Sequence, residues 1–279
     1  MKVPEYILTE SMALLVPVFG NRETKALLRA LQEDLFGSGF PEWTAATATR
    51  WKAAIQRILG GEPLAYITGV SHFLNLKLTV NPHVLIPRPE TEELAVMAIH
   101  YIKSIHHAQV LDVGTGSGCL ALAIKSSCPN AKVYALDIDS KALETAKANA
   151  DAYHFPIDFR PFDFLNENGW TSLPDHLDLI ISNPPYIGET EKTLMSASTL
   201  QYEPPHALFA GTDPLVFYKQ IARFGKDHLN PGGRIMVEIN EFRAKETEEV
   251  FRTAGYPGIE LYKDLSGKER ILVVSKLAS

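Results

Sequence analysis

The run Ser182-Asn183-Pro184-Pro185-Tyr186 places an amide, two prolines and an aromatic ring directly after the apolar residues 177–181. Such an apolar run is typical of a buried parallel strand, and open α/β sheets carry their chemistry where the strands end. Because the prolines stiffen the backbone, the segment presents the Asn183 side-chain carbonyl, the Pro184 backbone carbonyl and the Tyr186 ring as a fixed set. This set can accept both hydrogens of an NH₂ group and cover it. The pattern predicts a site that holds a planar amino or amide nitrogen.

A glycine-rich segment upstream is a candidate cofactor site. The strand candidate 109–113 contains Asp112 and leads through Gly114-Thr115-Gly116-Ser117-Gly118 into a helix. Glycines let a backbone approach a ligand closely, and a helix N-terminus offers free N–H groups to a carboxylate. The next strand candidate ends at Asp137, and an acidic residue about 20 positions after such glycines is the usual partner of a ribose diol. The G-x-G-x-G spacing differs from the dinucleotide pattern, and with the Asn-Pro-Pro-Tyr run it indicates S-adenosylmethionine (SAM), whose methyl group is electrophilic.

The composition limits the class of protein. A chain of 279 residues with 46% hydrophobic and 22% charged residues is ordinary for one large or two modest globular domains. Its net charge of −6 argues against a broad basic surface, so direct binding of nucleic acid is not expected, although a local basic patch remains open. Two cysteines imply no disulfide framework and favour a reducing, cytoplasmic setting. The apolar stretch 12–18 is broken by Pro17, so neither a signal peptide nor a membrane span is expected, and no Cys/His spacing resembles a metal site.

Two kinds of pattern divide the chain. Residues 1–72 have helical periodicity over 5–16, 21–36 and 47–59, which predicts a small helical domain. Residues 73–80 alternate apolar and polar side chains, and after a turn residues 84–86 are apolar again. A β-hairpin linker is therefore expected over 73–86.

From residue 87 to 279, strand and helix patterns alternate, which predicts an α/β fold with a parallel sheet covered by helices on both faces. The strand candidates are 109–113, 132–137, 157–160, 177–182, 233–239, 258–262 and 270–275. The helix candidates are 90–103, 119–126, 140–152, 213–228 and 243–254. Only a short link joins the last two strands, which predicts one antiparallel strand at the end of the sheet.

Several longer motifs resemble those of the release factor glutamine methyltransferases (the HemK/PrmC family), and the match covers essentially the whole chain. The matching runs are Pro63-Leu64-Ala65-Tyr66-Ile67-Thr68-Gly69, Val84-Leu85-Ile86-Pro87-Arg88-Pro89-Glu90-Thr91-Glu92, Asp112 to Gly118, Asn183-Pro184-Pro185-Tyr186-Ile187 and Tyr202-Glu203-Pro204-Pro205-His206-Ala207-Leu208. The Pro-Arg-Pro-Glu-Thr-Glu run is the most specific. Asn-Pro-Pro-Tyr alone is shared with DNA adenine and rRNA guanine methyltransferases.

The resemblance implies a seven-stranded, Rossmann-like SAM-dependent methyltransferase sheet over 87–279 and a helical domain, 1–72, that helps to engage the protein substrate. It also implies transfer of a methyl group to N5 of the glutamine in the Gly-Gly-Gln motif of class 1 peptide-chain release factors. One departure is clear, because the family usually has Gly and then Gln where this chain has Asn240-Glu241-Phe242-Arg243. Since Asn tolerates a left-handed backbone, Asn240 is expected to keep a glycine-like turn.

Other candidate site residues have two interpretations each. Asp112 is either a cap or an anchor for the loop or for the ligand amine, and Asp137 either caps the next helix or binds the ribose. For both, the second role is favoured. Asp163-Phe164 either bind and stack an adenine or form a structural pair.

Three charged residues complete the candidates. Arg88 either forms an ordinary ion pair with Glu90 or contributes to the SAM or glutamine pocket, and the resemblance favours the pocket. Glu238, at the end of a strand, is expected to face the substrate.

The predicted chemistry is positional. A glutamine amide nitrogen is a poor nucleophile, and the chain shows no Ser, Cys or His triad. The Asn183 side-chain oxygen and the Pro184 carbonyl are expected to accept the two N–H hydrogens and aim the lone pair at the methyl group, beside the Tyr186 ring. Three other functions compete: a nucleic-acid amino-methyltransferase, a noncatalytic SAM-binding module and a dinucleotide oxidoreductase.

Overall fold

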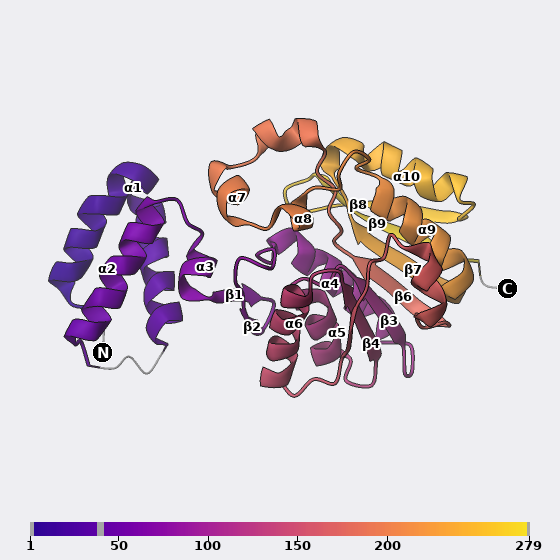
Figure 1. Cartoon of the computed structure of the whole chain (residues 1–279), viewed down its shortest axis with the longest axis horizontal. Coiled ribbons are helices and arrows are strands. Elements are labelled where there is room, and N and C mark those ends of the chain that lie inside the picture. Colours follow the sequence, from indigo (N-terminus) through magenta and orange to yellow (C-terminus); the bar gives the residue numbers. More distant parts are fainter. Residues whose placement is uncertain (1–2, 38–41, 278–279) are drawn as a thin grey trace. The chain divides into compact units, whose positions relative to one another are not determined.

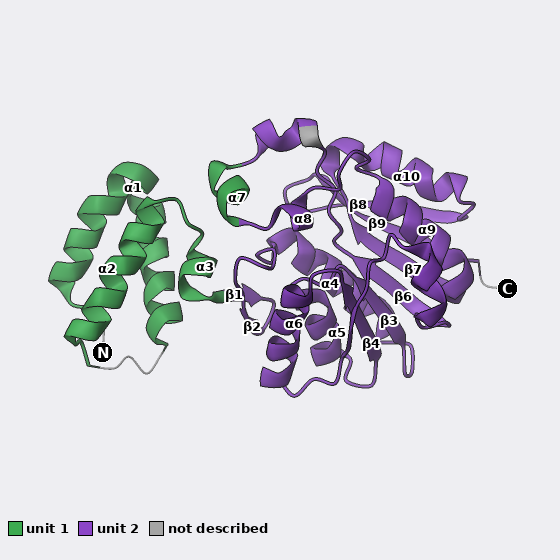
Figure 2. Cartoon of the chain, viewed as in Figure 1, with its two compact units in different colours: residues 1–70, 196–202 green, residues 71–195, 203–279 purple. Residues whose placement is uncertain are grey.

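The computed structural model describes residues 3–37 and 42–277. The chain divides into two compact units, residues 1–70 with 196–202 and residues 71–195 with 203–279 (Figure 2). The short helix α7 (Ala197–Tyr202) thus belongs to the first unit although it comes from the middle of the chain. The Ser198 hydroxyl donates to the Gly61 carbonyl (2.6 Å), and the Tyr202 hydroxyl donates to the Gly60 carbonyl (3.1 Å). The division expected from sequence does not contain this excursion.

The first unit is helical. Its elements are α1 (Glu5–Phe36), α2 (Ala45–Leu59), α3 (Leu64–Thr68) and α7. The two helices expected over 5–16 and 21–36 are both present within α1, and they meet at a kink at Gly20 (φ 76°, ψ 164°), three residues after Pro17. The core of this unit contains the fully buried Trp51, whose indole N–H donates to the Ser11 hydroxyl (2.9 Å). At the start of α2, Thr44 and Thr47 form a reciprocal capping box.

The hairpin exists, but its expected position is wrong. Its strands are β1 (Val70–Phe73) and β2 (Leu76–Thr79), and residues 84–86 form no strand. The tight turn falls at Leu74, which has φ 50°, a backbone conformation that leucine rarely adopts. The turn signals at Asn81 and Pro82 mark a loop instead. Sequence patterns therefore pointed to the wrong turn, because the real one carries no glycine or proline.

The second unit contains a seven-stranded sheet in the order β5-β4-β3-β6-β7-β9-β8 (Figure 1). Its strands are β3 (Gln109–Val113), β4 (Lys132–Asp137), β5 (Asp158–Pro161), β6 (Leu177–Ser182), β7 (Leu229–Glu238), β8 (Gly258–Lys263) and β9 (Glu269–Ser275). All expected strands are present, and β7 begins earlier than expected, where its register against β6 is irregular.

The single antiparallel strand expected among the last two is present, but its expected position at the end of the sheet is wrong. β9 pairs antiparallel with both β7 and β8, so it lies inside the sheet and β8 forms the edge. The reason is burial. Residues 271–274 of β9 are all buried, whereas most of β8 is partly or fully exposed. The uninterrupted apolar run Ile271-Leu272-Val273-Val274 is the signal that marks β9 as the inner strand.

Helices cover both faces of the sheet. The longer ones are α4 (Pro89–Ile102), α5 (Cys119–Ser127), α6 (Ser140–Ala152), α9 (Val216–His228) and α10 (Ala244–Thr253), and the short ones are α8 (Pro205–Leu208) and the 3₁₀ turns η1 (Glu167–Ser172), η2 (Glu189–Leu194) and η3 (Glu241–Arg243). Helices α4, α5 and α6 cover one face, and α9 and α10 cover the other (Figure 1). Alternate β3 residues enter the two cores, with Val110 on the first face and Leu111 on the second.

The strand order reverses between β3 and β6. From β3 the chain continues outward to β4 and β5, and then returns to place β6 on the other side of β3. The loops that leave β3 and β6 therefore diverge and open a crevice at the carboxyl ends of these strands. The glycine-rich segment follows β3 and the Asn-Pro-Pro-Tyr run follows β6, so the fold brings both to this crevice.

Candidate active site

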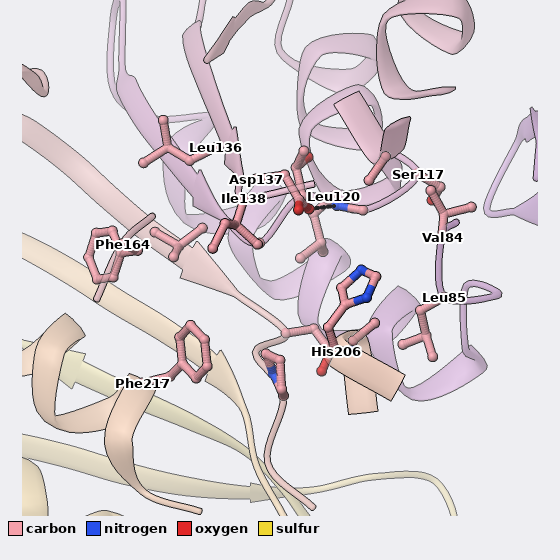
Figure 3. Close-up of a pocket in the computed structure, with 18 of the residues that line it drawn as sticks. Val84, Leu85, Ser117, Leu120, Leu136, Asp137, Ile138, Phe164, His206 and Phe217 are labelled. Atoms are coloured by element: carbon pink, nitrogen blue, oxygen red, sulfur yellow. Dashed lines mark hydrogen bonds between the residues drawn. The ribbon is translucent and has the colours of Figure 1, made fainter. Parts of the chain in front are cut away.

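A cavity of about 330 Å³ lies at the carboxyl ends of β3, β4 and β6 (Figure 3). Its volume is at the lower end of the range typical of small-molecule sites. Nine residues predicted from the sequence line it: Arg88, Gly114, Thr115, Gly116, Asp137, Asp163, Phe164, Asn183 and Pro185. Five other predicted residues are not among the lining residues: Asp112, Gly118, Pro184, Tyr186 and Glu238.

The glycine-rich loop presents bare backbone to the cavity. The N–H groups of Gly114 and Thr115 both donate to the Leu136 carbonyl (2.9 and 2.8 Å), which fixes the loop to β4. Gly114 and Gly116 have φ of 73° and 55°, and a Cβ atom on either would meet nothing within 4 Å. A ligand can therefore approach this backbone closely. Gly118 has a different role, because its Cβ would lie 2.6 Å from a Leu122 methyl group; it allows close packing at the start of α5.

Asp112 is fully buried beneath the loop. One carboxylate oxygen accepts a hydrogen bond from the Thr115 hydroxyl (2.6 Å), and the other has no hydrogen-bond partner. Burial raises the pKa of Asp112 from 3.8 to about 7, against the opposing effects of the Thr115 hydroxyl and the Ala121 N–H. Of the roles expected from sequence, anchoring the loop matches these contacts. Binding of a ligand amine stays a prediction.

Asp137 lies at the end of β4 and holds two turns with its two oxygens. It accepts the Gly116 N–H (2.8 Å, dashed line in Figure 3) and the Asp139 N–H (2.9 Å). Burial raises the pKa of Asp137, and these two N–H donors act against that shift. It does not cap α6, because Asp139 accepts the Lys141 N–H at that helix start. Each Asp137 oxygen keeps a lone pair for a ligand hydroxyl.

Polar and apolar side chains both line the cavity. His206, from α8, points toward the side that carries Ser117 and Leu120, near Asp137, and its ring lies 3.5 Å from the Asp139 carboxylate (Figure 3). Phe164 and Phe217 lie together toward the other end (Figure 3). Ile138, also lining the cavity, is 64% exposed and offers an apolar side chain to a ligand. The Asp137 carboxylate suits the polar sugar of a nucleoside, and the two aromatic rings suit its flat base.

Asp163 and Phe164 line the cavity, but both are also held by the protein. The Asp163 carboxylate accepts the Leu165 N–H (3.0 Å). The Phe164 ring is 3% exposed and packs against Trp170 and the edge of Phe224. Adenine binding by this pair stays a prediction.

Asn183 reaches the cavity from the end of β6, and its amide orientation is fixed behind it. Its side-chain nitrogen donates to the Thr91 hydroxyl (3.0 Å), and Thr91 donates to Glu238 (2.6 Å). The Tyr186 hydroxyl donates to the other Glu238 oxygen (3.0 Å). Glu238 and Tyr186 therefore support the site from behind. The Ser182 hydroxyl, which donates to the Val113 carbonyl (2.6 Å), ties the end of β6 to β3.

Burial shifts the pKa values of both Glu238 and Tyr186. It raises the pKa of Glu238, and the hydrogen bonds from Thr91 and Tyr186 act against that rise by stabilising the carboxylate. Burial and the nearby Glu238 charge together raise the pKa of Tyr186 far above its ordinary value. Tyr186 is therefore a hydrogen-bond donor at neutral pH and is not a general base.

Arg88 pairs with Glu203 and not with Glu90. The guanidinium donates to the Glu203 carboxylate (2.5 Å), whose other oxygen accepts the Ile86 N–H (3.3 Å). Glu203 is 4% exposed, so it is a buried anchor for the segment that precedes α4. This contact holds Arg88 in place at the edge of the cavity, which Arg88 lines.

The expectation for Asn240 is wrong. Its backbone has φ −71° and ψ 121°, which is an extended conformation and not a left-handed one. Its side chain makes the turn instead, because the carbonyl oxygen accepts the Phe242 N–H (3.0 Å). The amide nitrogen donates to Glu191 (2.7 Å), which also pairs with Arg243 (3.0 Å). These contacts tie the segment after β7 to η2, which follows the Asn-Pro-Pro-Tyr run.

Sequence reasoning missed several residues of the site, chiefly Thr91, Ile138, His206 and Phe217. Thr91 and His206 stand inside motif runs but carry no individual signal, and Phe217 lies in a helix far along the chain. Among residues 3–37 and 42–277, no cluster of three or more His, Cys, Asp or Glu side chains is arranged to hold a metal ion. None of the helices in these ranges is both long and apolar enough to cross a membrane.

The comparisons with known proteins agree with this architecture. A family model for the methyltransferase small domain matches residues 95–213. The 16S rRNA N2 G1207 methyltransferase of T. thermophilus, solved with AdoMet and guanosine, is 18% identical with a TM-score of 0.52, covering 74% of this chain and 49% of that chain, and so shares the fold. The seven-stranded sheet, the loop after β3 and the family match define a Rossmann-like methyltransferase.

Two curated relatives are more specific. The release factor glutamine methyltransferase of Bacteroides thetaiotaomicron is 39% identical over 223 residues, covering 80% of this chain and 79% of the relative. That of Koribacter versatilis is 38% identical over 240 residues, covering 85% of this chain and 83% of the relative. The chain belongs to the release factor glutamine methyltransferase family.

Proposed function

We propose that this enzyme transfers a methyl group from SAM to the side-chain amide nitrogen, N5, of the glutamine in the Gly-Gly-Gln motif of class 1 peptide-chain release factors. The observation that carries the proposal is the meeting of two motifs in one cavity. The bare loop backbone after β3 and the Asn183 amide after β6 line the same space. Family membership supports the glutamine amide, among planar nitrogens, as the acceptor.

The residues present fit SAM. Gly114 and Gly116 leave open space where a side chain would otherwise stand, and Asp137 keeps lone pairs for a ribose diol. The apolar end with Phe164 and Ile138 suits an adenine. When bound, SAM supplies an electrophilic methyl group on a sulfonium centre.

The chain's own residues act on the acceptor amide. The Asn183 side-chain oxygen and the Pro184 backbone carbonyl accept its two hydrogens, which orients the nitrogen lone pair. As positive charge gathers on the nitrogen, the same two carbonyl dipoles stabilise it. Pro184 is buried and is not among the residues that line the cavity, so the role of its carbonyl rests on its position between Asn183 and Pro185, which both line it. No side chain is required as a strong base, because the proton of the product nitrogen can leave to water.

The helical unit is proposed to bind the release factor away from the reacting amide. Every residue assigned to SAM or to the amide lies in the second unit, so the first unit is free for this role. Its α1 helix exposes large apolar side chains, including Leu14 (49%) and Val18 (62%). Both cysteines are unpaired, which suits the cytoplasm, where we place the reaction.

One experiment tests the proposal. The purified enzyme is incubated with isotopically labelled SAM and either a purified class 1 release factor or RNA and DNA, and mass spectrometry locates the label. We expect one labelled methyl group on the glutamine of the Gly-Gly-Gln motif. An Asn183→Ala variant is the control and is expected to leave the factor unlabelled. Label on nucleic acid, or on another residue of the factor, would refute the assignment.

A further inference from the structure

We infer that Thr91 and Glu238 are positioning residues that set the polarity of the Asn183 amide, so that its oxygen faces the acceptor nitrogen. This inference rests on the proposed function. An asparagine side chain has a donor end and an acceptor end of nearly equal shape, and only the acceptor end can bind the hydrogens of an amide nitrogen. The site must therefore choose between two orientations of Asn183 that packing alone does not distinguish.

The Glu238 carboxylate determines which orientation of Asn183 is favourable. This carboxylate is 2% exposed and, when ionised, can only accept hydrogen bonds. The Tyr186 hydroxyl donates to Oε1 (3.0 Å), and the Thr91 hydroxyl donates to Oε2 (2.6 Å). Both neighbours of the carboxylate are therefore donors, and their hydrogens point toward it.

Thr91 links Glu238 to Asn183, because its hydroxyl donates to the first and accepts from the second. A threonine hydroxyl has one hydrogen, and Thr91 directs that hydrogen to Glu238. What Thr91 offers to Asn183 is consequently an oxygen lone pair, which only the Asn183 NH₂ end can satisfy at 3.0 Å. The flipped amide would bring two oxygens together with no hydrogen between them, inside a buried network. Asn183 therefore turns its carbonyl oxygen away from Thr91.

This arrangement explains why three residues beside the cavity wall matter to its chemistry. Thr91 borders the cavity but is only 2% exposed, and Glu238 and Tyr186 do not line the cavity. None of the three is required to touch the reacting atoms, because each acts through Asn183 or its backbone. The carboxylate thus selects for an acceptor nitrogen that still carries hydrogens, and an acceptor group without N–H would face the lone pairs of the Asn183 oxygen.

The test uses the full-length enzyme and two substitutions at one position. Thr91→Val keeps the shape of the side chain but removes the hydroxyl, and Thr91→Ser keeps the hydroxyl but removes a methyl group. Thr247→Val is the matched control, since Thr247 is also fully buried in the second unit and donates to the Arg243 carbonyl (3.0 Å), away from Asn183. For each variant, kcat and KM on a release factor, SAM affinity by calorimetry and the thermal midpoint are measured.

Thr91→Val is expected to bind SAM within about twofold of the wild type and to lose at least tenfold in kcat, because an amide that is free to flip presents its NH₂ end for part of the time. Thr91→Ser is expected to restore most of kcat, and Thr247→Val to leave it unchanged. Glu238→Gln, which offers either a donor or an acceptor to Thr91, is expected to lower kcat as well.

Two results would overturn the inference. Wild-type kcat in Thr91→Val would show that the hydroxyl does not orient the amide, and equal losses in Thr91→Ser and Thr91→Val would assign the effect to packing. If Thr91→Val does not fold, Thr91→Ala replaces it in the comparison with Thr91→Ser. A wild-type enzyme that fails to methylate release factors would refute the proposed function itself, which separates the two failures.

Discussion

The buried Asp112 carboxylate should make the second unit less stable as the pH rises. Its pKa is raised by burial from 3.8 to about 7, so the folded state holds the Asp112 proton more tightly than the unfolded chain does. The stabilising effect of that proton is fully present below pH 3.8 and is lost as the pH rises through about 7. At 1.36 kcal/mol per pKa unit, the loss between pH 5 and pH 8 is roughly 2–3 kcal/mol.

The perturbation is Asp112→Asn, which removes the charge and keeps an oxygen for the Thr115 hydroxyl. Unfolding free energies of the wild type and the variant are measured in urea at several values between pH 5 and pH 8. Cys119 and Cys128, the only cysteines in the chain, both lie in the second unit near the ends of α5. Both are partly exposed in the folded state, so it is the increase in their rate of chemical modification on unfolding that reports on that unit alone.

At each pH, the unfolding free energy of the wild type is subtracted from that of the variant. The decisive quantity is this difference at pH 8 minus the same difference at pH 5. A constant cost of burying the Asn NH₂ group cancels in this comparison, as does the contribution of Glu238, whose pKa burial also raises. The charge of Asp137 repels that of Asp112, so the relief of this repulsion in the variant is part of the difference. We expect a value of roughly +2–3 kcal/mol, because the wild type loses stability between pH 5 and pH 8 and the variant does not lose this contribution. Parallel curves for the two proteins would show that Asp112 does not titrate in this range, and the reasoning from its burial would fail.

Three further predictions concern binding and transfer. Asn183→Ala should abolish methyl transfer while SAM still binds, as measured by product mass and calorimetry; loss of SAM binding would reassign Asn183 to the cofactor. Asp137→Ala should weaken SAM binding about 10- to 150-fold for each ribose hydrogen bond lost, since such a bond to a carboxylate is worth roughly 1.5–3 kcal/mol, and unchanged affinity would leave Asp137 as a turn anchor only. Leu14→Ser with Val18→Ser should raise KM for an intact release factor but not for a short Gly-Gly-Gln peptide. Leu265→Ser, which changes a 95% exposed leucine of the second unit, is the matched control, and equal effects on factor and peptide would contradict remote recognition by the helical unit.

The sheet could be predicted from sequence because its signals are local. Continuous apolar runs such as 177–181 mark buried strands, and the glycines of 114–118 mark the turn from β3 into α5. The hairpin was misplaced because its turn depends on the positive φ of Leu74, and a leucine gives no signal for that conformation. The short link between β8 and β9 does not indicate which of the two strands forms the edge of the sheet. The four consecutive buried residues of β9 do indicate it.

The candidate site also has a part that could be predicted from sequence and a part that could not. The groups that line the cavity come from segments with recognisable patterns, and their placement follows from the strand order alone. The groups that support them could not be predicted in this way. Thr91 is 92 residues from Asn183 and 147 residues from Glu238 along the chain, so no local pattern indicates that they are hydrogen-bonded. Glu238 was expected to face the substrate since it ends a strand, yet it turns into the protein to accept the Thr91 and Tyr186 hydroxyls.

The departure from the family pattern after β7 shows how a side chain can replace a backbone conformation. Glycine permits a left-handed turn, but Asn240 keeps an extended backbone and closes the turn with its own carbonyl oxygen. Its NH₂ end then remains available, and it binds Glu191, which Arg243 also binds. A glycine at this position would supply neither contact. The substitution therefore carries a consequence beyond the turn, because it couples η2, the segment that follows the Asn-Pro-Pro-Tyr run, to the strand end that carries Glu238. In this chain both Asn183 and the residues downstream of it are held from the end of β7.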